Sequence, residues 1–141
     1  MFLKTKQYLN QAYRLNELIE SNNLEIAQLN QLKTSLSGID YSKDKIQNSS
    51  SGDANFTKII ERIDELERII KEDTAKMLSL KIEIRNVINS VKDNEEKLVL
   101  KCRYLNFMIW DDICEVAHVS LRTVFRIHDS ALENVKIPEQ T

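Results

Sequence analysis

Two arginines at helical spacing carry the clearest chemistry in this chain. Arg122 and Arg126 lie four residues apart in the stretch SLRTVFRIH, so a helix there places both guanidinium groups on one face. A guanidinium offers paired donors that match two acceptors on the edge of guanine or two phosphate oxygens. Thr123 and Phe125 belong to the same outward side, where Phe125 suits a thymine methyl group or a protein surface. The pattern predicts a recognition surface.

A short turn before this helix predicts how the helix is held. The preceding helical pattern, WDDICEVA, contains the small residue Cys114, which lets a second helix approach closely. Ala117 and His118 form the turn, Val119 fills the corner, and Ser120 suits the N-cap of the second helix. Two helices joined in this way form a helix-turn-helix, which presents its second helix to the major groove of DNA.

The opposite face of the second helix is apolar. Val124 and Ile127 recur at helical spacing, Ala131 continues the same face, and Ile113 of the first helix is expected beside them. Burial of this face leaves the arginines outward. The alternative interpretation is that both arginines are ordinary solvated charges on a helix surface.

Other kinds of chemistry find little support in the composition. Cys102 and Cys114 are the only cysteines and His118 and His128 the only histidines, too few ligands at suitable spacing for a metal site. Both cysteines fall inside helical patterns, as small buried residues do in a reducing cytoplasm. A nucleophile paired with a base and a phosphate-binding glycine loop are both missing, so we expect neither catalysis nor a cofactor.

Three short helices are expected in the C-terminal part, residues 92–136. Asp93 or Asn94 suits the N-cap of the first, with Glu95 and Glu96 in its first turn. The patterns WDDICEVA and LRTVFRIHDSALENV supply the second and third helices, and residues 137–141 form a tail. Trp110 is expected to anchor the middle helix to the first.

A heptad pattern indicates a long coiled-coil helix before this module. Its positions alternate in steps of three and four residues, and all but one are apolar. They are Phe56, Ile59, Ile63, Leu66, Ile70, Asp73, Met77, Leu80, Ile84, Val87 and Val91. A weaker pattern of the same spacing predicts another helix over residues 4–36. Glycine, proline and strand-like alternation are scarce, so the fold class is all-α.

Residues 39–54, rich in Ser, Asn, Asp and Gly, predict a loop between the two long helices. Residues 1–91 would then form an antiparallel helical hairpin. With the loop centred near residue 47, Asn22 and Asp73, the polar interruptions of the two seams, would share a layer that fixes the register. The alternative is that both side chains point sideways to solvent.

The C-terminal stretch LKCRYLNFMIWDDICEVAHVSLRTVFRIHDSAL resembles region four of sigma-70-type transcription factors. Within that group it is most similar to small phage proteins that regulate late-gene transcription, the RinA/ArpU-like family. The matching residues are Leu100, Arg103, Tyr104, Trp110, Ile113, Ser120, Val124, Arg126, His128, Ala131 and Leu132. The likeness is specific over residues 98–133 and weak before residue 90. Three positions depart from the family: His118 replaces a turn glycine, Ile109 replaces a serine cap, and Phe125 replaces a polar outward residue.

This resemblance implies a DNA-binding regulator of phage or prophage late genes. The residues expected at double-stranded DNA are Ser120, Arg122, Thr123, Phe125, Arg126 and His128. His128 lies beyond the first two turns, where it suits packing or a phosphate contact. One alternative function is an adaptor that binds RNA polymerase or another protein through the same module. Another is a DNA-packaging recognition subunit.

The charge balance weighs against DNA. Residues 95–135 carry five basic and seven acidic side chains, whereas DNA affinity draws heavily on phosphate neutralisation. The last helix nevertheless has no acid between Leu121 and His128. A homo-oligomer, assembled through the helical arm, would double the basic edges, and the arm could equally contact RNA polymerase. With neither a secretory signal nor a membrane span in the sequence, we expect the cytoplasm of a bacterial host cell.

Overall fold

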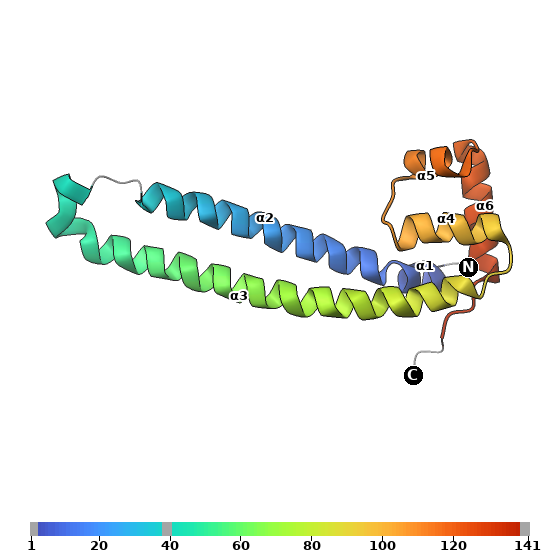
Figure 1. Ribbon diagram of the computed structural model, residues 1–141, viewed down its shortest axis with the longest axis horizontal. Coiled ribbons are helices and arrows are strands. Elements are labelled where there is room, and N and C mark those ends of the chain that lie inside the picture. Colours follow the sequence, from blue (N-terminus) through green and yellow to red (C-terminus); the bar gives the residue numbers. More distant parts are fainter. Residues whose placement is uncertain (1–2, 38–40, 139–141) are drawn as a thin grey trace. The chain divides into compact units, whose positions relative to one another are not determined.

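The computed structural model describes residues 3–37 and 41–138, with side chains for residues 3–36 and 52–138. Its described elements are all helices: α1 (Leu3–Leu9), α2 (Gln11–Ser37), α3 (Tyr41–Asn89), α4 (Asn94–Tyr104), α5 (Trp110–Ala117) and α6 (Leu121–Asn134) (Figure 1). The described residues include no strand, which confirms the all-α class. None of these helices combines the length and apolar character that crossing a membrane requires.

The chain divides into two compact units, and the smaller is a pair of helices. Residues Glu17–Ala75 contain most of α2 and the first part of α3. Within this unit the helices lie side by side, and contacts pair low numbers on α2 with high numbers on α3, so they run in opposite directions (Figure 1). Ile19 of α2 and Ile63 and Leu66 of α3 are buried, as their heptad positions predict.

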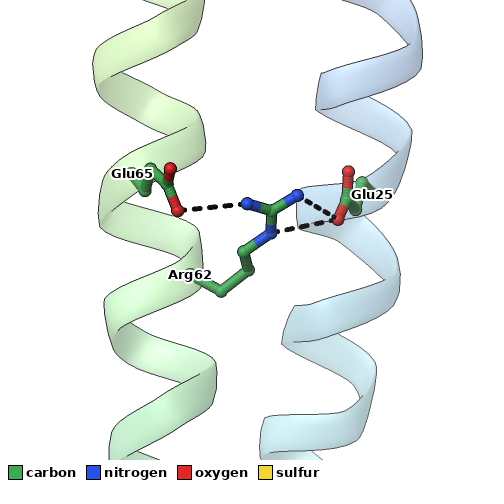
Figure 2. A network of polar contacts seen from close by, with 3 residues as sticks. All are labelled: Glu25, Arg62 and Glu65. Carbon is green, nitrogen blue, oxygen red and sulfur yellow. Dashed lines mark hydrogen bonds and ion pairs between the residues drawn. The ribbon is translucent and has the colours of Figure 1, made fainter.

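An exposed ion-pair cluster joins the two helices. Arg62 of α3 reaches Glu25 of α2 at 3.2 Å and Glu65, one turn along α3, at 3.0 Å (Figure 2). All three side chains are about half exposed, so water screens the pairs and each contributes little to folding. The cluster marks which parts of the helices lie opposite each other, and apolar burial stabilises the pairing.

The register of α2 against α3 differs from the one that the sequence predicted. The two helices share a groove lined by Leu32 and Leu36 of α2 and by Asn55 and Ile59 of α3. Continued along both helices, this pairing places Asn22 near the level of Ile69 and about one turn from Asp73. The prediction that Asn22 and Asp73 share a layer is therefore wrong.

The predicted loop over residues 39–54 is also wrong for most of its length. Residues 38–40 lie outside the described residues, but α3 begins at Tyr41 and is helical through the rest of that segment. A helix already nucleated by packing extends at small cost, since every added residue closes one more backbone hydrogen bond. Gly52 lies within α3, where nothing approaches within 4 Å of the position that a Cβ atom would take.

The larger unit combines the two ends of the chain, Met1–Asn16 and Lys76–Thr141. Its main core draws on α1, the start of α2, the end of α3, α4 and α6. The buried members are Tyr8, Leu9, Ala12, Ile84, Ile88, Val91, Leu100, Tyr104, Leu105, Ala131, Leu132 and Val135. The predicted boundary between residues 91 and 92 cuts through this core. A module of about 45 residues buries too little apolar surface by itself, so α4 and α6 complete their burial against the other helices.

Capping and turn residues end the C-terminal helices where local chemistry predicts. The Asp93 carboxylate accepts hydrogen bonds from the backbone N–H groups of Glu95 at 2.8 Å and Glu96 at 3.1 Å, so Asp93 is the N-cap of α4. Phe107, between α4 and α5, has a left-handed φ of 57°. Val135 after α6 is buried, and the tail is described as far as Pro138.

Candidate nucleic-acid interface

A second core holds α4, α5 and α6 together and orients the last helix. Its buried members are Val99, Cys102, Ile113, Val124 and Ile127, and Cys114 and Val119 pack against them. The roles predicted for Ile113, Val124 and Ile127 are confirmed. With these positions facing inward, residues 122, 125 and 126 of α6 must face solvent.

The turn between α5 and α6 has the geometry that the sequence predicts. His118 has a left-handed backbone with φ 58°, and the Cys114 carbonyl accepts hydrogen bonds from the N–H groups of His118 and Val119. Histidine adopts this conformation less readily than glycine, so the turn stores a small strain. Ile109, the N-cap of α5, supplies no side-chain hydrogen bond, as expected.

Ser120 ends the turn and starts α6. Its hydroxyl oxygen accepts a hydrogen bond from the Thr123 N–H at 3.2 Å and lies 3.0 Å from the Thr123 hydroxyl. Ser120 is therefore the predicted N-cap, and the capping interaction also fixes the Thr123 side chain. Both hydroxyls lie at the N-terminal end of α6, the end that contacts base edges in proteins that bind DNA through a helix in the major groove.

The predicted contact residues divide into an exposed group and one buried member. Ser120, Arg122, Phe125 and Arg126 are exposed, and Thr123 is half-buried beside them. Among the residues that the structure describes, neither arginine has an ion-pair partner. The structure therefore brings together five of the six predicted residues on the first two turns of α6.

His128 is the exception, and its prediction as a DNA contact is wrong. Its side chain is only 5% exposed, and Nε2 lies 2.6 Å from the Tyr104 hydroxyl of α4. Burial, with the positive charges of Lys6 and Arg103, lowers its pKa to about 4 against the opposing effect of Asp129. The imidazole is neutral at pH 7 and belongs to the core. His128 follows the buried Val124 by four residues, so both lie on the same inward face of the helix, and this spacing is the sequence feature that indicates burial.

An aromatic cluster supports Phe125 from behind. The Phe125 ring meets Trp110, the first residue of α5, edge to face with centroids 5.1 Å apart. The Arg103 guanidinium lies 4.5 Å from the centre of the Trp110 ring, and His128 packs against that ring at 4.8 Å. Trp110 thus links α5 to α4, as predicted, and also links α5 to α6.

Apolar side chains extend this outer surface further than the sequence indicated. Leu121 and Phe125 are each 42% exposed, and their spacing of four residues puts them in one row of α6. Val116 and Ile109 at the two ends of α5 are exposed as well. The sequence pattern did not single out Leu121, because an apolar residue beside a helix cap is usually assigned to the core.

Acidic side chains approach one of the two arginines. Arg126 borders a cleft that it shares with Asp93, Glu95 and Glu96. Glu96 is buried, and its carboxylate accepts hydrogen bonds from Ser130 at 2.6 Å and Asn134 at 2.9 Å. The carboxylates offset part of the charge of Arg126, whereas Arg122 lies outside this cleft.

Groups suited to a metal ion are absent from the described part of the chain, where no three His, Cys, Asp or Glu side chains cluster appropriately. Cys102 and Cys114 are free thiols. Burial raises the pKa of the Cys102 thiol, which makes it a poor nucleophile.

Comparison with known families identifies a matching family model. A family model described as a protein of unknown function, DUF1492, matches residues 35–136. The chain belongs to the DUF1492 family. The matched region of this chain runs from the end of α2 through α6, so it includes the whole candidate interface. No curated protein and no solved structure matches the chain.

Proposed function

We propose that this chain is a DNA-binding transcriptional regulator that docks α6 in the major groove. The observation that supports it most is the outward face of α6, which an apolar core holds from behind. Arg122 and Arg126 are exposed on this face and have no ion-pair partner among the described residues. The turn at His118 and the cap at Ser120 are the local features that a helix-turn-helix requires. The resemblance to sigma-70 region four and to RinA/ArpU-like proteins makes phage or prophage late genes the proposed target.

We further propose that α2 and α3 form an antiparallel coiled-coil arm. The heptad seam and the buried Ile19, Ile63 and Leu66 support this packing. Such an arm would serve self-association or contact with RNA polymerase in the bacterial cytoplasm. Self-association fits the charge balance, since two copies present twice the number of basic side chains to one DNA.

A second function has its own supporting observation. Ile109, Val116, Leu121 and Phe125 are exposed apolar side chains on α5, α6 and their flanks, and Asp111, Asp112 and Glu115 are exposed on α5. A surface of that composition also suits a protein partner. The alternative is therefore an adaptor that binds RNA polymerase or another protein without touching DNA.

Selection from a random-sequence duplex pool distinguishes the two functions. With the full chain as bait, the DNA-binding hypothesis predicts enrichment of a common sequence. Affinity for that duplex should fall with salt by a slope of about −0.9 for each phosphate contact on logarithmic axes. A scrambled duplex of the same composition should bind at least tenfold more weakly. If no sequence is enriched at low salt, the adaptor becomes the better explanation.

A further inference from the structure

The exposed phenylalanine on α6 is held in a defined direction. Phe125 is 42% exposed, and its ring meets Trp110 edge to face at a centroid distance of 5.1 Å and an interplanar angle of 72°. Trp110 is in turn fixed between Arg103 of α4 and His128 of α6. An exposed aromatic ring usually exchanges between rotamers, but here the contact with the fixed Trp110 ring restricts that freedom.

The position of this ring suggests what it contacts. Phe125 lies between Arg122 and Arg126 in sequence, one residue before the second arginine, and Leu121 precedes it by one helical turn. The outer face of α6 thus has a basic row beside an apolar row. In the major groove, the thymine C5-methyl is the apolar group on a base edge, while guanine and phosphate present acceptors suited to arginine.

We propose that Phe125, with Leu121 beside it, reads thymine methyl groups and that Trp110 is the positioning residue for the Phe125 ring. This inference rests on the proposed function and specifies the sequence that α6 would select. Arg122 and Arg126 bind hydrogen-bond acceptors on guanine or phosphate. The apolar row of Leu121 and Phe125 discriminates thymine from the other bases. The target site therefore contains thymine where the middle of the first two turns of α6 meets the groove.

Deoxyuridine provides a direct test, because it keeps the base pairing of thymine and lacks only the methyl group. The duplex enriched by the full chain is resynthesised with deoxyuridine at one thymine position at a time. Wild type should lose about fourfold in affinity at one or two positions, the change expected when one buried methyl group is removed. Phe125→Ala should bind the thymine duplex several-fold more weakly and lose nothing more with deoxyuridine at those positions.

Matched variants distinguish a loss of thymine recognition from a loss of folding stability. Leu98→Ala removes an apolar side chain of similar exposure, 38%, on α4 and should keep the full preference for thymine. Trp110→Phe should retain most of that preference, and Trp110→Leu should lose it while still binding DNA in a salt-dependent way. The thymine preference is a ratio measured within one folded variant, so a modest loss of stability does not change it.

The outcomes distinguish this inference from the function on which it rests. If no duplex is enriched, the DNA-binding function fails and the inference with it. If a duplex is enriched and wild type binds it equally well with deoxyuridine at every position, DNA binding stands and thymine reading is refuted. A Phe125→Ala variant that keeps the wild-type thymine preference also refutes it.

Discussion

His128 shows how a single polar side chain is accommodated in the core of the larger unit. Its Nε2 has the Tyr104 hydroxyl as a partner at 2.6 Å, and its ring lies against Trp110. Burial also raises the pKa of Tyr104 to about 12, so both groups are neutral near pH 7. A neutral hydrogen-bonded pair avoids the large desolvation cost of a buried charge.

Protonation of His128 should destabilise the fold in mild acid. Its folded pKa of about 4 lies below the ordinary 6.5, so the unfolded chain takes up the proton first as pH falls. The stabilisation is present above pH 6.5 and is lost progressively as pH falls toward 4. Between pH 6.5 and pH 5 the loss is about 2 kcal/mol, at about 1.4 kcal/mol for each pH unit.

Urea denaturation at the two pH values checks this for wild type and His128→Gln. The variant should lose markedly less stability across the interval, because glutamine has no proton to gain. His118→Asn is the control, since His118 is exposed and asparagine tolerates its left-handed backbone. Equal pH dependence in wild type and His128→Gln would show that His128 is not the titrating group.

At the scale of helices, apolar burial rather than exposed ion pairs stabilises the pairing of α2 and α3. Leu66 is 2% exposed, whereas Leu24 of α2 is 61% exposed. Leu66→Ala should therefore lower the free energy of unfolding by about 2–5 kcal/mol, and Leu24→Ala by about 0.5 kcal/mol or less. Thermal and urea unfolding followed by circular dichroism measure both. Similar losses in the two variants would contradict the described packing.

Local interactions explain which helix ends the sequence predicted correctly. The cap at Ser120, the cap at Asp93 and the turn at His118 each depend on residues within a few positions, and all three are confirmed. The start of α3 depended on packing further along the helix, which local propensity does not contain. The placement of Asn22 against Asp73 likewise depended on how α2 and α3 pack, which neither helical pattern specifies alone.

The same contrast applies to the candidate site. The spacing of Val124 and Ile127 correctly predicted which face of α6 is outward, and therefore the exposure of Arg122 and Arg126. Helical spacing also puts His128 on the inward face, but its polar character favoured an outward assignment. The support that Trp110 gives to Phe125 involves three helices, so no single helical pattern predicts it.

At the scale of the whole molecule, the C-terminal helices share their main core with the start of the chain. Leu9 and Ile84 are fully buried in the cluster that contains Leu100 and Leu132. A fragment of residues 92–141 exposes these last two side chains to water. It should therefore show no cooperative thermal transition under conditions where the full chain melts cooperatively.

Circular dichroism of that fragment and of the full chain makes the comparison. Leu9→Ala in the full chain should lower stability by about 2–5 kcal/mol, and the exposed Leu3→Ala should serve as its near-neutral control. A fragment that melts cooperatively at the temperature of the full chain would show that residues 92–136 fold independently.

Removal of both arginines from α6 tests most directly whether this helix binds DNA. Arg122→Ala combined with Arg126→Ala should leave the thermal melt nearly unchanged, because surface substitutions usually alter stability by about 0.5 kcal/mol or less. The control, Arg14→Ala with Arg85→Ala, removes the same charge from exposed positions on α2 and α3. Binding is measured by fluorescence anisotropy on the enriched duplex at two salt concentrations. We expect at least a tenfold loss of affinity for the α6 variant and a much smaller loss for the control. Wild-type affinity in the α6 variant would contradict the assignment of α6 as the DNA-reading helix.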